Sequence, residues 1–178
     1  MSRFGKSHWL DLGQTLLKTE GPAALTIERM TDYAGKTRGS FYHHFKSRNA
    51  FLEAMIAAWQ RSSLTQLAER LQNAESLEAK RAVMRGVSSE WDAAFERQLR
   101  FLAAQEPHVA ALLATIDQLR IQGLASMIRL LQPDIEDPDA FAFVQYASIV
   151  GGQMLLNSSD DPRIPAIRKV GNELFGLG

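Results

Sequence analysis

The 178-residue sequence contains no cysteine. This absence excludes disulfide bonds, thiolate metal ligands and a cysteine nucleophile, and it fits a cytoplasmic protein. A run of about 18 apolar residues, the length that crosses a bilayer as a helix, is also missing. The first residues, Met1 to Lys6, lack the hydrophobic segment of a signal peptide. We therefore expect a cytoplasmic chain with no membrane partner.

The sequence has no net charge either, because 20 Lys and Arg balance 20 Asp and Glu. The charges are nevertheless unevenly distributed. Residues 1–60 contain eight Lys or Arg and five Asp or Glu, a net charge of +3, which leaves −3 for residues 61–178. A basic N-terminal segment favours contact with nucleic acid, and chance clustering of charge is the alternative.

Strand-like alternation is missing, and apolar residues recur at helical spacing along almost the whole chain. Breaks at Gly21-Pro22, at Gly35 and at Lys46–Asn49 separate three short helices from a long one, for which Ser47 is a credible N-cap. Later breaks are expected at 73–76, with Ser76 as a cap, near Pro107, at 132–138 and at 157–162. The helix that begins at Leu77 is expected to continue through Trp91 to Phe95. The pattern predicts an all-α protein with a three-helix domain over residues 1–46 and a second helical domain over residues 47–178.

Residues 26–45 indicate a helix-turn-helix, in which a bracing helix precedes one that enters the major groove of DNA. Thr26 is a suitable N-cap for the first helix, and Gly35 is a suitable residue for the turn. Phe41 and Phe45 are expected to pack the second helix on the core. Arg38 lies at its first turn, where a guanidinium can contact guanine O6 and N7 together; a solvated surface arginine is the alternative.

The segment Ala34-Gly35-Lys36-Thr37-Arg38-Gly39-Ser40-Phe41-Tyr42-His43-His44-Phe45-Lys46-Ser47-Arg48 resembles the tetracycline-repressor (TetR) family of bacterial regulators. The resemblance covers roughly residues 6–55. It implies a homodimer that binds a palindromic double-stranded DNA operator, represses transcription, and is released when a small-molecule effector fills the second domain. The positions that contact DNA in the family fall here on Thr26, Ile27, Thr37, Arg38, Gly39, Ser40, Tyr42, His43, His44, Lys46 and Arg48. Lys36 departs from the family, which usually has a small aliphatic residue there, and Glu28 is acidic where a basic or neutral residue would help to bind a phosphate.

Bulky side chains of the second domain fit either a packed core or an effector cavity. The candidates for a ligand pocket are Met55, Trp59, Met84, Trp91, Phe95, Met127 and Tyr146, with Phe101 as a further bulky residue. Arg85, Arg120 and His108 are candidates for binding the polar group of an effector. The last two helices are rather apolar, and the resemblance implies that they pair across a two-fold axis into a four-helix interface. The candidates for that interface are Val144, Ser148, Gly151, Gly152, Leu155, Ile167, Val170 and Leu174, although Gly151-Gly152 fits a simple bend as well.

Sequence patterns of catalysis are missing. No Ser-His-Asp arrangement, phosphate-binding loop or Glu-x-x-His pair is present, so we expect neither an enzyme nor a cofactor. His43 and His44 are adjacent and diverge by about 100° on a helix, which disfavours a shared metal. The competing hypothesis is a helical interaction protein whose helix-turn-helix does not bind DNA. The favoured one is a regulator in the bacterial cytoplasm, associated with the nucleoid through DNA.

Overall fold

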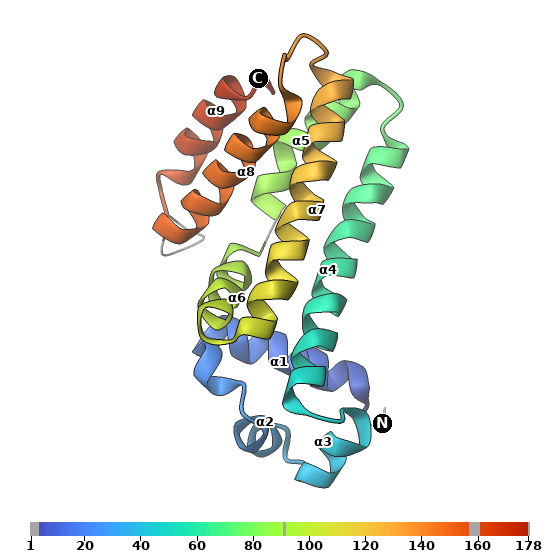
Figure 1. Ribbon diagram of the computed structural model, residues 1–178, viewed down its shortest axis with the longest axis vertical. Coiled ribbons are helices and arrows are strands. Elements are labelled where there is room, and N and C mark those ends of the chain that lie inside the picture. The colour runs from blue at the N-terminus through green and yellow to red at the C-terminus, as the bar shows by residue number, and fades with distance from the viewer. Residues whose placement is uncertain (1–3, 91, 157–160, 178) are drawn as a thin grey trace. The chain divides into compact units, whose positions relative to one another are not determined.

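The computed structural model describes residues 4–90, 92–156 and 161–177, and within these ranges it is helical with no strand (Figure 1). The elements are α1 (Lys6–Glu20), the 3-10 helix η1 (Pro22–Ala24), α2 (Ile27–Ala34), α3 (Arg38–His44), α4 (Arg48–Asn73), α5 (Leu77–Glu90), α6 (Ala93–Gln105), α7 (Pro107–Leu131), α8 (Pro138–Leu155) and α9 (Ile164–Leu174). The all-α prediction is confirmed. No helix of this described part is long and apolar enough to span a bilayer.

The ends of α2 and α3 follow from residues of the helix-turn-helix segment. The Thr26 hydroxyl accepts a hydrogen bond from the Arg29 amide at 3.1 Å, and the Thr37 hydroxyl accepts one from the Ser40 amide at 3.2 Å. Gly35 ends α2 in the left-handed conformation, with φ of 60° and ψ of 37°, a conformation that costs glycine little. The cap predicted at Thr26 and the turn predicted at Gly35 are therefore confirmed.

Most later helix ends also lie where short polar segments predicted them. Ser47 and Ser76 accept hydrogen bonds from the amides three residues further on, as N-caps do, and Pro107 opens α7. One expectation is wrong: the helix that begins at Leu77 ends at Glu90, and Phe95 belongs to α6. The residue before α6 is Asp92, whose short polar side chain favours helix starts.

The chain divides into two compact units, and the first contains residues 1–62 and 95–113. Its core is aromatic: the Phe41 ring lies 5.5 Å from the Trp9 ring and 5.5 Å from the Phe51 ring, measured between centroids. Gly13 of α1 lies directly against α4, because a Cβ at this position would come within 2.4 Å of Phe51 Cζ. The missing side chain at position 13 thus allows the two helices to pack closely.

The second unit contains residues 63–94 and 114–178. Ala125 and Ile128 of α7 pack against Ala142 of α8 in its core. The Arg85 guanidinium donates to the carbonyl of Leu177 at 2.9 Å, which joins α5 to the C-terminal segment. Because α4 and α7 contribute residues to both units, neither unit is one continuous stretch of chain. The division into residues 1–46 and 47–178 stays a prediction.

Candidate nucleic-acid interface

The turn between α2 and α3 is fixed by main-chain hydrogen bonds. The Lys36 amide donates to the Thr31 carbonyl at 2.9 Å, and the Gly35 amide donates to the Asp32 carbonyl at 3.1 Å. Phe41 and Phe45 then bury one side of α3, with their rings 5.3 Å apart. The prediction that both phenylalanines belong to the core is confirmed, and the other side of α3 faces solvent.

The solvent-facing side of α3 carries most of the residues that the family resemblance selected. Arg38, Gly39, Tyr42 and His43 are exposed, and Ser40 and His44 are partly exposed. Lys46, just after the helix, is exposed as well. This face therefore carries hydrogen-bond donors, a planar guanidinium, a phenol ring and imidazole rings. Side chains of these kinds contact the bases and phosphates of DNA.

Three other residues from that selection have their side chains otherwise engaged. The hydroxyls of Thr26 and Thr37 accept the capping hydrogen bonds described above. The Ile27 side chain is only 8% exposed, so a contact from Ile27 with DNA would be made by its main chain.

Arg48 is directed into the protein. Its Nε donates to the Leu25 carbonyl at 2.5 Å, and its Nη1 pairs with Glu106 Oε1 at 2.5 Å. Leu25 immediately precedes the N-cap of α2, and Glu106 lies between α6 and α7. Arg48 therefore connects the start of α4 to two other segments of the same unit, and the predicted contact of Arg48 with DNA stays a prediction.

The two departures from the family pattern have structural partners. The Lys36 ammonium lies 5.4 Å from the centroid of the Phe4 ring, a cation–π distance. Lys36 is exposed rather than packed inside. Glu28 Oε1 lies 2.7 Å from Arg38 Nη2, so an acid of α2 pairs with the first residue of α3.

Comparison with known proteins agrees with this geometry. Residues 10–55 match the family model of bacterial regulatory proteins of the tetR family. Residues 10–55 are therefore similar to the N-terminal domain of TetR-family regulators. No match was found among curated proteins.

Solved structures extend the likeness to the whole fold. A transcriptional regulator from Saccharomonospora viridis in complex with choline has a TM-score of 0.82 at 14% identity, over 96% of this chain and 95% of that one. A TetR-family regulator from Rhodococcus sp. has a TM-score of 0.70 at 19% identity, over 93% and 95%. The reduced form of NemR from E. coli has a TM-score of 0.75 at 18% identity, over 96% and 94%. At these identities the likeness shows that the chain has a TetR-type fold.

The pocket candidates of this TetR-type chain are divided between the two units. In the first unit Met55 lies against Gly13, and the rings of Trp59 and Phe95 are 5.1 Å apart. Met84, Met127 and Tyr146 belong to the second unit. Trp91 lies outside the described residues. The ligand pocket stays a prediction.

Polar partners surround Tyr146 between α7 and α8. The Tyr146 hydroxyl donates to Asp117 Oδ1 at 2.6 Å, and Arg120 Nη1 lies 3.5 Å from the hydroxyl oxygen. Burial, and then the hydrogen bond to Asp117, raise the pKa of Tyr146 to about 12.

Of the three candidates for binding an effector's polar group, Arg120 is in this cluster, whereas Arg85 contacts Leu177. His108 Nδ1 lies 3.6 Å from Glu106 Oε2 in the first unit.

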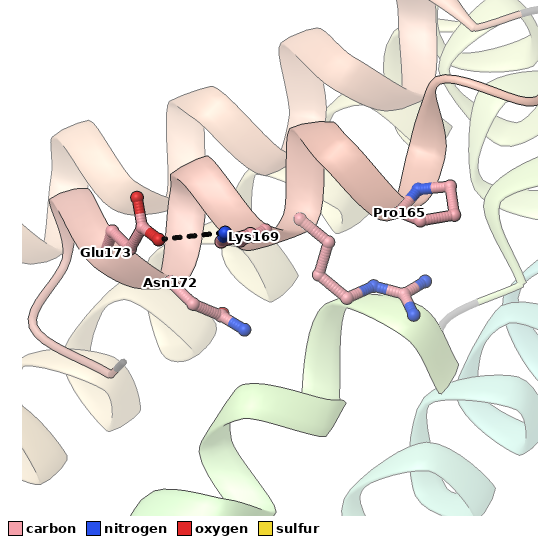
Figure 2. Close-up of a pocket in the computed structure, with 5 residues that line it drawn as sticks. Pro165, Lys169, Asn172 and Glu173 are labelled. Atoms are coloured by element: carbon pink, nitrogen blue, oxygen red, sulfur yellow. Dashed lines mark ion pairs between the residues drawn. The ribbon is translucent and has the colours of Figure 1, made fainter.

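An open hollow of about 460 Å³ lies along α9, and Figure 2 shows the residues that line it. Its lining residues are Pro165, Arg168, Lys169, Asn172 and Glu173, which all belong to this one helix. Lys169 and Glu173, one turn apart on α9, form an ion pair at 3.9 Å. None of the predicted pocket residues lines this hollow, and a surface that a single helix lines does not enclose a ligand.

The candidates for the dimer interface follow one face of α8 and one of α9. On α8, Val144, Ser148 and Leu155 are exposed, and Gly151 and Gly152 are partly exposed. A Cβ built on either glycine would meet nothing within 4 Å, and α8 continues through both. On α9, Ile167, Val170 and Leu174 are exposed. Both faces carry large apolar side chains in contact with water in the single chain, but dimerisation itself stays a prediction.

Sequence reasoning did not select Glu28 or Glu106 as functional residues. A signal for Glu28 existed, since it is an acid in the first turn of α2, next to a segment expected to bind phosphates. Glu106 is 58 residues from Arg48 in the chain. No local sequence pattern predicts an ion pair between residues so far apart. Among the described residues, no three His, Asp or Glu side chains gather as metal ligands would.

Proposed function

We propose that this chain is a DNA-binding transcriptional repressor that acts on the bacterial nucleoid, binds a palindromic operator as a homodimer, and is released by a small-molecule effector. One observation supports the DNA contact above all others. Phe41 and Phe45 bury one side of α3, and its opposite side exposes Arg38, Tyr42 and His43. A short helix held in this way can enter a major groove without rearranging the domain.

The exposed residues divide by chemistry into two kinds of contact. Arg38 at the first turn of α3 is suited to a guanine edge, and Gly39 allows the backbone close to the groove. Ser40 can bond to either a base or a phosphate. Tyr42, His44 and Lys46 are suited to phosphates, and such contacts make binding fall steeply as salt rises.

A dimer supplies the geometry of a palindromic operator. Two copies of α3 must be about 34–36 Å apart to occupy successive major grooves on one side of the duplex. The exposed apolar faces of α8 and α9 are suited to pairing two copies across a two-fold axis, since burying them removes large hydrocarbon surfaces from water. The glycines of α8 would let the paired backbones approach closely.

Release by an effector needs two arrangements of the chain that bind DNA differently. The helix α4 begins directly after the helix-turn-helix and contributes residues to both units. An effector that prefers one arrangement of α4 would shift the population away from the operator-binding spacing. Choline, present in a regulator of similar fold, belongs in a panel of candidate effectors together with apolar and aromatic compounds.

Selection of binding sites from random duplex DNA with the purified full-length chain tests the proposal. We expect a palindromic consensus, two chains per site, and an affinity that falls as salt is raised. A folded, dimeric protein that enriches no consensus at moderate salt would refute the DNA-binding function.

A double substitution separates a regulator from an interaction protein. Replacing Arg38 and Tyr42 with Ala removes two exposed side chains and leaves the core of α3 intact. A regulator then loses operator affinity and keeps its helical circular dichroism spectrum. Retention of full operator affinity would show that α3 is not the recognition helix.

A further inference from the structure

The ion pair between Glu28 and Arg38 connects the starts of the two helices of the helix-turn-helix. Glu28 is the second residue of α2 and Arg38 the first of α3. Glu28 Oε1 and Arg38 Nη2 are 2.7 Å apart, and each side chain is 61% exposed. The pair therefore lies on the surface that the proposed function directs toward DNA.

Stability does not explain this pair. Exposed ion pairs contribute little to folding, because water and side-chain entropy offset the attraction. A carboxylate on a DNA-facing surface also weakens the attraction to phosphates. The Glu28 carboxylate thus weakens binding to DNA of any sequence. A role for Glu28 in recognising one DNA sequence would offset this loss.

Arginine chemistry indicates what that role is. The guanidinium has five N–H donors in a rigid plane, and a carboxylate that occupies one edge leaves the others free to donate. An unconstrained arginine loses most of its rotamer entropy when it is fixed on a base. A partner that orients the guanidinium plane before DNA binds reduces this loss of entropy. It does so only for a base that lies in the direction in which the guanidinium is held.

Resting on the proposed function, we propose that Glu28 is a specificity-determining residue that positions Arg38 for a guanine in the operator. The Glu28 carboxylate holds one side of the guanidinium through the ion pair, and the free donors of the guanidinium meet O6 and N7 of the base. Removal of Glu28 then leaves Arg38 able to contact several bases or a phosphate, so sequence discrimination falls while general affinity for DNA rises.

Glu20 provides a matched control in the same domain. Glu20 Oε2 pairs with Arg29 Nη2 at 2.7 Å, with side chains 33% and 56% exposed, and this hydrogen bond raises the pKa of Arg29. The pair joins the end of α1 to α2 and does not involve α3. Glu20→Ala and Glu28→Ala each remove one negative charge. Both therefore strengthen non-specific DNA binding, because each reduces the electrostatic repulsion from the phosphates.

The experiment measures the affinity of the full-length protein for a selected operator and for its single-base-pair variants, at one salt concentration. Arg38→Ala identifies the base pair that Arg38 reads, because discrimination there falls by about tenfold or more. We expect Glu28→Ala to reduce discrimination at that same base pair by about fivefold, and to have no further effect in the Arg38→Ala background. We expect Glu20→Ala to leave discrimination unchanged. Circular dichroism confirms that each variant is folded.

Three results overturn the role of Glu28. Unchanged discrimination in Glu28→Ala shows that Arg38 does not need the carboxylate. An equal loss in the Arg38→Ala background shows that Glu28 reads a base itself, as a carboxylate can by accepting from cytosine N4. Sharper discrimination in Glu28→Ala shows that the carboxylate withholds Arg38 from DNA. A wild-type chain without any sequence preference instead removes the proposed function, and the role of Glu28 with it.

Discussion

Arg48 and Glu106, which are 58 residues apart in the chain, form an ion pair of 2.5 Å with side chains only 28% and 22% exposed. The same arginine also donates to the Leu25 carbonyl, just before α2. One guanidinium therefore joins the segment before the helix-turn-helix, the start of α4 and the junction of α6 with α7.

Removing the charge of Glu106 tests the energetic weight of this connection. Glu106→Gln leaves the partly buried Arg48 without its counter-charge, and we expect the free energy of unfolding to fall by about 1.5–3 kcal/mol. Urea denaturation followed by circular dichroism measures the change. The control is Glu173→Gln on α9, which removes an exposed pair of 3.9 Å and is expected to change stability by less than about 1 kcal/mol. Equal effects of the two substitutions would contradict the importance of the Arg48 connection.

Gly13→Ala tests the close approach of α1 to α4. The new Cβ would lie 2.4 Å from Phe51 Cζ and 2.8 Å from Met55 Sδ, so the core must shift, at a cost of about 1–3 kcal/mol. Thermal and urea denaturation measure the loss. Gly123→Ala on α7 is the control, because nothing lies within 4 Å of its Cβ, and it is expected to gain up to about 1 kcal/mol from helix propensity. A neutral Gly13→Ala would show that the two helices are not packed as closely as described.

Leu155→Glu tests the pairing of α8 and α9 between two chains. Leu155 is 79% exposed, so a charge there is tolerated in a single chain and disfavoured in an apolar interface. We expect a monomer by light scattering after size-exclusion chromatography, with operator affinity reduced by about a hundredfold or more as the second half-site contact is lost. Leu77→Glu changes an exposed leucine on α5 and should leave the dimer intact. A Leu155→Glu protein that remains dimeric would place the interface elsewhere.

Tyr146 gives the chain a pH dependence at the alkaline end. Burial raises the pKa of Tyr146 to about 12 from an ordinary value of 10.0, so the folded state favours the neutral phenol. This contribution to stability is complete below pH 10 and is lost as pH rises to about 12, by roughly 2–3 kcal/mol in total. Other groups titrate in this window, so the measurement is the difference between wild type and Tyr146→Phe, which lacks the ionisable hydroxyl. Parallel stability profiles of the two proteins between pH 9 and pH 12 would refute the shift.

The sequence predicted those parts of the fold that depend on residues close in the chain. Thr26, Gly35 and Ser47 act within three or four residues of their own position, through caps and one left-handed turn. The burial of Phe41 and Phe45 followed from helical spacing in the same way. These local rules suffice for a helix-turn-helix, because nearly all of its ends are determined by its own residues.

Features that depend on distant residues were not predictable. The inward direction of Arg48 depends on Glu106, which is 58 residues away in the chain. The break between α5 and α6 was missed because the segment around Asp92 contains neither Gly nor Pro, the two residues that interrupt helices most strongly.

The coupling of Glu28 with Arg38 constrains how a chain of this kind can acquire a new target sequence. A change at position 38 alone would leave an uncompensated carboxylate facing the phosphates, and a change at position 28 alone would loosen the choice of base. Either single substitution therefore produces an intermediate that binds DNA more weakly or with less sequence selectivity. Descendants that recognise a different operator are therefore expected to differ at both positions together.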